Sequence, residues 1–212
     1  MSKTSKGIIL VCIVLVVILA ASYGMALLSR RGVDRAIRQI TAIDLGKTRL
    51  EEWRNMIDRS SVPGYSFGCK DDKCGIGWRR ENTLLQRLHL APPTVIDCSV
   101  GFKGGVASSV YIAVAVAGHD SNGHWRDERG VVVQQNTEGK ESCNPHYRIS
   151  VRKREVTGET YWGTVAMDGC VLTQDKARAM AVNTSCLTRI GGCKTLEDML
   201  PEISWSTEAA SQ

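Results

Sequence analysis

Seven cysteines beyond the N-terminal apolar run are the residues best suited to chemistry in this chain. They are Cys69, Cys74, Cys98, Cys143, Cys170, Cys186 and Cys193. This density in a head of about 150 residues favours an oxidising compartment, where disulfides stabilise a domain with a modest core. Cys69 and Cys74 enclose the loop CKDDKC and suit a local bridge, while Cys170 with Cys186 or Cys193 would tie down the C-terminal segment. The connectivity stays open, and the odd number leaves one thiol free or paired between chains.

A zinc site is the competing interpretation of the cysteines. Its ligands would be Cys69, Cys74, Cys143 and His146. Structural zinc sites usually have paired short cysteine knuckles, which these spacings lack. We therefore expect disulfides and no metal.

Other reactive side chains have simpler explanations. His119, Asp120 and His124 lie in GHDSNGH, whose composition is typical of a turn between strands. The run 143–146 places a thiol near an imidazole, as in a nucleophilic site, but a disulfide is the favoured use of that cysteine. The sequence contains no GxSxG elbow, HExxH pair, Walker loop or dinucleotide fingerprint. We expect a non-enzymatic protein with no cofactor and no small-molecule substrate.

The charge of the chain is too mild to indicate nucleic-acid binding. The sequence has 27 Lys and Arg against 22 Asp and Glu, and Lys3 and Lys6 precede the apolar run. The densest basic run, 148–154, lies on a predicted strand, where a solvated strand face is the favoured interpretation.

An uncharged run of 22 residues from Gly7 to Leu28 follows a short leader, 1–6. A helix of this length crosses ~30 Å of hydrocarbon, whereas the apolar part of a cleaved signal is usually ~7–15 residues. The sequence therefore predicts a transmembrane helix over 7–28. Cleavage at Ala20-Ala21-Ser22 is the alternative.

Two features disagree about the orientation of this helix. The arginines directly after the run are Arg30, Arg31, Arg35 and Arg38. Their excess over the leader lysines puts the head in the cytoplasm by the positive-inside rule. The cysteines favour the other side, and long domains cross membranes regardless of flanking charge. We expect a single-pass inner-membrane anchor with the head in the periplasm, and keep a cytoplasmic head as the alternative.

Residues 29–59 continue the helix in amphipathic form. Their apolar stripe consists of Ala36, Ile40, Ile43, Leu50, Trp53 and Ile57. Gly46 predicts a bend, and 60–64 ends the helix. We expect the stripe to pack on the sheet of the head.

The remainder, 60–212, reads as one β-rich head with a disordered C-terminal tail. Strands are predicted at 95–100, 109–117, 130–135, 147–153 and 160–166. Short loops such as 120–123 and 136–139 predict an antiparallel meander. Short helices are expected from Asn82, as N-cap, to Leu90 and over 173–183. The predicted fold is α+β: a long N-terminal helix packed on an antiparallel sheet and stapled by disulfides.

This layout resembles that of a type IV pilin or pseudopilin. The features that carry the resemblance are the leader MSKTSKG, the apolar run directly after it, the amphipathic continuation, the antiparallel sheet and the late cysteines. The resemblance implies cleavage by a prepilin peptidase after Gly7, a mature chain beginning at Ile8, and a helix that packs in a filament core. Cys12 stands where the family usually has a glutamate, and Ile8 where it usually has phenylalanine. Minor, tip-located members sometimes lack that glutamate, so the resemblance favours a minor subunit.

Two functions are consistent with these patterns. In the first, the chain is a structural subunit of an envelope or filament assembly, and its partners are the inner membrane and other protein subunits. In the second, it is an anchored periplasmic binding module, such as an inhibitor, an immunity factor or a component of an envelope complex. A mature N-terminus at Ile8 would favour the first, and an intact Met1 the second.

Overall fold

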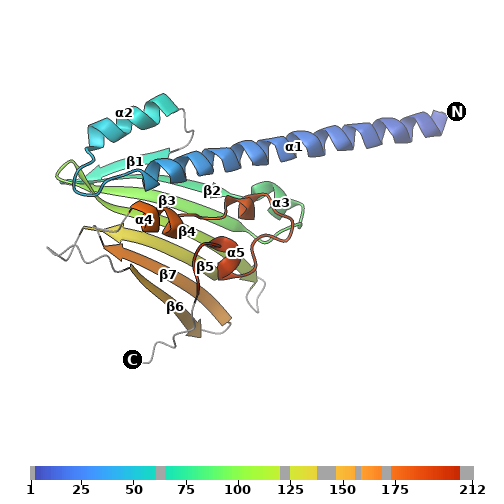
Figure 1. The fold of residues 1–212 in the computed structure, drawn as a ribbon. Helices are drawn as coiled ribbons and strands as arrows, with labels where there is room; N and C mark the ends of the chain where they lie inside the picture. Colours follow the sequence, from blue (N-terminus) through green and yellow to red (C-terminus); the bar gives the residue numbers. More distant parts are fainter. Residues whose placement is uncertain are drawn as a thin grey trace.

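The computed structural model describes residues 3–60, 65–119, 125–137, 147–155, 159–168 and 173–205. The helical elements are α1 (Lys3–Thr41), α2 (Leu50–Ser60), α3 (Thr83–Arg87), α4 (Thr173–Ala179), η1 (Thr184–Leu187) and α5 (Leu196–Met199). The strands are β1 (Tyr65–Lys70), β2 (Lys73–Glu81), β3 (Thr94–Lys103), β4 (Val106–His119), β5 (Trp125–Asn136), β6 (Tyr147–Glu155) and β7 (Glu159–Asp168). The helices lie on one face of the sheet, and the N-terminal part of α1 projects from the head (Figure 1). The α+β prediction is confirmed.

The strands form one sheet in the order β1-β2-β3-β4-β5-β7-β6. Every neighbouring pair is antiparallel except β5 and β7, which are parallel. The predicted meander is therefore correct from β3 to β5 and again between β6 and β7. It is wrong at the step from β5 to β6, because β5 pairs with β7, so 136–139 does not connect two paired strands. The inner strand β7 buries Val165 and Met167. The strand β6, which carries the basic run, is an edge strand of the sheet, and charged residues are common on edge strands.

The predicted bend near Gly46 is a complete break between two helices. α1 ends at Thr41, and Gly46 has a φ of 77°, a conformation that glycine adopts without steric cost. The Gly46 N–H donates to the Ala107 carbonyl at 2.8 Å, and the Leu50 N–H donates to the Gly105 carbonyl at 2.9 Å. These bonds tie the connection to the β3–β4 turn. Helical periodicity alone does not reveal them, because they depend on a distant partner.

The apolar stripe packs against the head's own sheet, as predicted. Ala36, Ile40, Ile43, Trp53 and Ile57 are each at most 1% exposed and belong to one core. The sheet contributes the side chains of Val110, Ile112, Val114 and Val116 to the same core. Leu50 is partly buried against it. The stripe and the apolar face of β4, which the alternation of apolar residues at 110, 112, 114 and 116 predicts, therefore cover each other.

An aromatic cluster holds α2 on the sheet. The ring of Trp53 lies 5.5 Å from that of Trp78 on β2 in an edge-to-face arrangement, and 5.6 Å from Phe102 on β3. Tyr65 on β1 extends the cluster, with 6.4 Å between its ring and that of Trp78. Aromatic pairs at such distances add to the free energy gained from burial alone.

The hairpin of β1 and β2 was not predicted. Three glycines and several charges lower the β-propensity of 65–81, and β1 is largely exposed. Alternation in β2, where Ile76 and Trp78 are buried, is the signal that sequence reasoning could have used. The turn residue Asp71 has a φ of 56°, which Asp tolerates better than most residues.

Both predicted short helices are present as α3 and α4. The proposed capping role of Asn82 is wrong, because its side chain makes no cap hydrogen bond. The Asn82 side chain instead donates to the Pro92 carbonyl at 2.8 Å and accepts from the Thr94 N–H at 2.8 Å. It therefore joins the ends of β2 and β3 across the loop that contains α3.

Candidate functional site at the junction of helix and head

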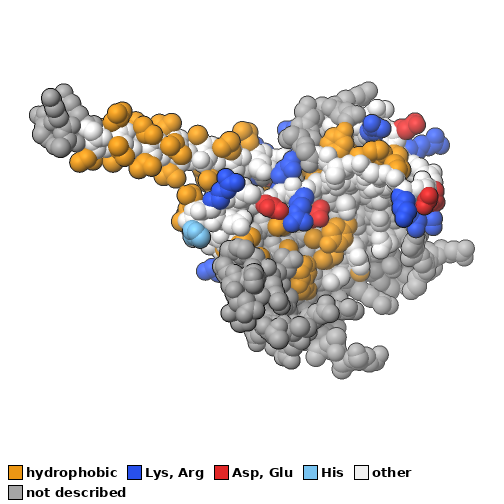
Figure 2. Space-filling view, turned by 180° about the vertical axis from the view of Figure 1, so that it is seen from behind, with side chains coloured by type: hydrophobic (Ala, Val, Ile, Leu, Met, Phe, Trp, Pro, Cys, Tyr) orange, Lys and Arg blue, Asp and Glu red, His pale blue; other side chains and the backbone are white. Residues whose placement is uncertain are grey.

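The projecting part of α1 is an uncovered apolar surface. From Ile8 to Leu19 its large apolar side chains are 45–66% exposed. Within the described ranges, α1 is the one helix long and apolar enough to cross a membrane. Figure 2 shows these side chains along the projecting part. Gly7, the residue before the expected cleavage point, has no atom within 4 Å of its would-be Cβ, and Ile8 is 66% exposed.

The C-terminal segment clamps the other half of α1. The Thr184 hydroxyl on η1 donates to Asp34 at 2.5 Å, and the Arg30 side chain donates to the Thr184 oxygen at 3.2 Å. The Lys176 ammonium on α4 donates to the Ile43 carbonyl just beyond α1. Burial lowers the pKa of Lys176, and the charge of Asp44 opposes that shift. Residues more than 130 positions apart in sequence therefore fix the head to the end of the helix.

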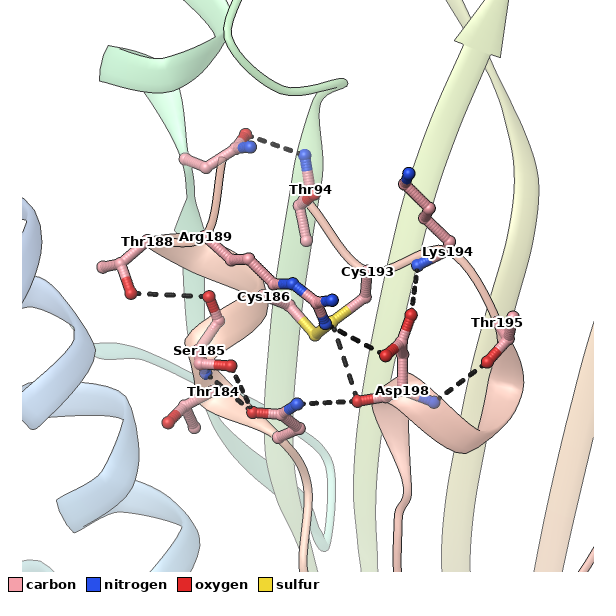
Figure 3. Close-up of a disulfide and its surroundings, with 12 residues drawn as sticks. Thr94, Thr184, Ser185, Cys186, Thr188, Arg189, Cys193, Lys194, Thr195 and Asp198 are labelled. Carbon is pink, nitrogen blue, oxygen red and sulfur yellow. Dashed lines mark hydrogen bonds and ion pairs between the residues drawn. A yellow bond between two sulfur atoms is a disulfide. The ribbon is translucent and has the colours of Figure 1, made fainter. Parts of the chain in front are cut away.

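A disulfide ties η1, the short helix that carries Thr184, to the segment that follows it. Cys186 bonds to Cys193, and both are at most 1% exposed (Figure 3). Beside the disulfide, the Asp198 carboxylate accepts from the Lys194 N–H at 2.9 Å and from Arg189 at 3.0 Å. The Lys194 N–H, followed by Arg189, lowers the pKa of Asp198, and partial burial opposes this. The Thr195 hydroxyl accepts from the Asp198 N–H and caps α5.

The structure places the predicted disulfide candidates in three groups. Cys69 pairs with Cys74 across the β1–β2 hairpin, as the short loop suggested. Cys186 pairs with Cys193, so neither bonds to Cys170, contrary to that expectation. Cys98 is a buried free thiol on the inner face of β3. Cys143 and Cys170 lie outside the described residues.

The structure bears on the alternative zinc site, and does not describe the other two candidate sites, the histidine-containing turn and the thiol–imidazole pair. Cys69 and Cys74 cannot be the predicted zinc thiolates while they are bonded to each other. In the described part of the chain, no three His, Cys, Asp or Glu side chains gather around a common point. The residues 120–124 and 143–146, with the expected turn and the thiol–imidazole pair, lie outside it.

The Cys98 thiol gives the head a specific response to alkaline pH. Burial, helped by the charge of Asp97, raises the pKa of Cys98 to about 12 from an ordinary value of 9.0. The unfolded chain therefore loses this proton at lower pH than the folded chain does. The resulting stability is complete below pH 9 and decreases as the pH rises from 9 toward 12.

We expect the Cys98→Ala variant to lose less stability than the wild type on alkalinisation. Between pH 8 and 10 the wild type should lose about 1.4 kcal/mol more than the variant, because a tenfold change in an equilibrium constant corresponds to that energy. Urea unfolding of the full chain in detergent at each pH measures the difference. Each unfolding transition must be shown to be reversible, because disulfide exchange at alkaline pH would prevent recovery of the native protein. Parallel pH profiles for the two proteins would contradict the prediction.

The sheet face opposite the helices has a shallow hollow of about 150 Å³. Its lining includes Arg79, Asp97, Tyr111 and Trp162 from four strands. Burial raises the pKa of Asp97 although Arg79 opposes the shift, and burial with the nearby Asp97 charge raises that of Tyr111. The ring of Trp162 covers Gly130, its partner in the β5–β7 register. The polar groups of the described lining are therefore one guanidinium, one carboxyl group, one phenol and one indole.

Sequence reasoning missed the residues that join the head to α1. Asp34, Lys176, Thr184 and Asp198 are common polar residues in segments without a motif. By sequence, the Asn183-Thr184-Ser185 triplet in this region fits a glycosylation acceptor and gives no sign of a contact with α1. In the structure, the Asn183 side chain accepts from the Ser185 N–H and donates to the Asp198 carbonyl, so it is a helix cap.

The comparisons with known proteins leave the family of the chain open. No protein-family model, no curated protein and no solved structure matches this chain. The structure itself has a pilin-like layout, a long apolar N-terminal helix followed by a mostly antiparallel sheet.

Proposed function

We propose that this chain is a membrane-anchored, non-enzymatic subunit of an envelope assembly, similar to a minor type IV pilin or pseudopilin. The contrast between the two halves of α1 carries the proposal. Ala36 and Ile40 are covered by the head, whereas Ile8 to Leu19 are exposed. A continuous apolar helix surface of this size is stable in lipid or against other helices. The helix is therefore both the anchor and the element available for assembly.

We place the head on the periplasmic side of the inner membrane. The two disulfides found among the described residues support this compartment, because reducing cytosol disfavours such bonds. An alkaline phosphatase fused after Gln212 should be active in cells, and a cytosolic fluorescent reporter at the same position should be dark. The reverse pattern would place the head in the cytoplasm, as the arginines after the span predict.

An anchored periplasmic binding module is the second candidate. The observation in its favour is the hollow around Asp97, Tyr111 and Trp162 on the sheet face opposite the helices. In this case the head would bind a partner, and α1 would serve as an anchor.

The N-terminus of the mature protein separates the two candidates. If the chain is processed like a pilin, Edman sequencing or mass spectrometry of protein from membranes should find Ile8 as the first residue. Gly7→Val should then leave Met1 in place. Gly24→Val is the matched control, since both glycines lie on α1 with no atom within 4 Å of a would-be Cβ. Met1 retained in the wild type would overturn the pilin-like proposal and favour the binding module.

A further inference from the structure

The head contacts α1 within the apolar segment itself. A hollow of about 220 Å³ is lined by Ser22, Met25 and Ser29 on α1, and by Thr83 and Leu84 on α3. Figure 1 shows α3 at the end of the head from which α1 projects. The head therefore begins before the apolar segment ends.

This overlap determines the level of α3 relative to a bilayer. The helix from Ile8 to Leu28 is about 31 Å long, which matches the hydrocarbon thickness of ~30 Å. Ser22 lies about 9 Å before Leu28 along the helix axis. When the apolar segment is in lipid with its boundary at Leu28, the residues packed beside Ser22 and Met25 lie about 5–9 Å below that boundary, the depth to which interfacial apolar side chains enter. Tyr23, 51% exposed on this part of α1, is of the type enriched at that boundary.

The surface next to α3 has the composition expected for that level. Leu88 and Leu90 are each 42% exposed, and Ile190 is 72% exposed. Their two loops are joined, because the Gly191 N–H donates to the Leu90 carbonyl at 2.8 Å. The exposed basic neighbours of these apolar residues are Arg87, His89 and Arg189. In the described part of the head, the other large apolar side chains this exposed are Met56 on α2 and Phe67 on β1.

We infer that the tip formed by residues 87–90 and 189–191 inserts into the headgroup layer of the membrane that α1 spans, with anionic lipids as its preferred contact. Apolar side chains at the tip enter the boundary between headgroups and acyl chains, and Arg87 beside them contacts lipid phosphates, whereas Arg189 is held by the Asp198 carboxylate. Arg30 and Arg31, directly after the apolar segment, add positive charge at the same level. The tip and α1 then hold the head at a fixed tilt on the bilayer. The inference rests on the proposed membrane anchor.

Site-specific fluorescence on the full chain in vesicles tests this inference. The environment-sensitive dye NBD is attached at Leu88→Cys in a Cys12→Ala background, and the same background without Leu88→Cys gives the signal to subtract. Met56→Cys on α2 is the matched control, because it is also a partly exposed apolar residue of the head. A third protein carries the dye on native Cys12, which is exposed on α1. The vesicles contain phosphatidylcholine and phosphatidylglycerol, with or without lipids that carry a quenching nitroxide near the headgroup.

The expected result is roughly twofold quenching of the dye at position 88, with none at position 56. Adding Ile190→Asp to the Leu88→Cys protein should reduce the quenching at 88. Vesicles of phosphatidylcholine without phosphatidylglycerol should also give weaker quenching at position 88. Equal quenching in the two kinds of vesicle would overturn the preference for anionic lipid.

The Cys12 dye separates this inference from the anchor on which it rests. Lipid quenchers that reach Cys12 but not position 88 would overturn the inference and leave the anchor intact. If neither position is quenched, the anchor and the inference both fail.

Discussion

The Trp53→Ala variant is expected to lose about 3–5 kcal/mol of stability, because it removes a fully buried aromatic side chain. Trp53 is 1% exposed and contacts Trp78 and Phe102, so its ring links α2 to β2 and β3. The indole N–H is buried and has no hydrogen-bond partner among the described residues. The stabilisation therefore comes from packing, and Trp53→Phe should retain most of it.

Thermal unfolding of the full chain in detergent measures this loss. For a head of this size, 3–5 kcal/mol corresponds to a melting temperature lower by roughly 6–20 °C. Met56→Ala, a change at an exposed position of the same helix, is the control and should have little effect. Equal melting temperatures for Trp53→Ala and Met56→Ala would show that α2 does not stabilise the core. The conclusion that its apolar stripe holds the head together would then be wrong.

Replacing both Cys186 and Cys193 by alanine is expected to cost about 2–3 kcal/mol, the loop-closure term for a ring of this length. Because both sulfurs are buried in the core, loss of packing adds to that term. Cys186 lies in η1, so the disulfide also holds the helix that carries Thr184, whose hydroxyl donates a hydrogen bond to Asp34. We therefore expect the C-terminal segment to release α1 before the sheet unfolds.

Limited proteolysis combined with urea unfolding separates these two effects. In the double variant, cleavage within 173–205 should accelerate at urea concentrations where the sheet remains folded. The matched control is Cys69→Ala with Cys74→Ala, which removes the other disulfide at the exposed edge of the sheet, where less packing is lost. Equal protection of 173–205 in both double variants would contradict the clamp.

The sequence by itself determined the elements that depend on local pattern. The apolar run predicted α1, and the recurrence of Ala36, Ile43, Leu50 and Ile57 every seven residues predicted the face that packs on the sheet, because helical periodicity is a property of neighbouring residues. Alternation in β4 likewise predicted its inner face. The local Cys69–Cys74 bridge was visible for the same reason, since five positions separate the two cysteines.

Only the tertiary structure decided the features that join distant segments. The break at Gly46 depends on hydrogen bonds to the β3–β4 turn. The position of β7 beside β5 depends on the burial of the β7 side chains Val165 and Met167 in the core. The junction between head and helix also falls in this class, because the Asp34–Thr184 bond spans 150 positions. Polar residues of this kind carry no periodic signal. Their roles follow from the packing of the apolar residues around them, which sets where each polar group must find its partner.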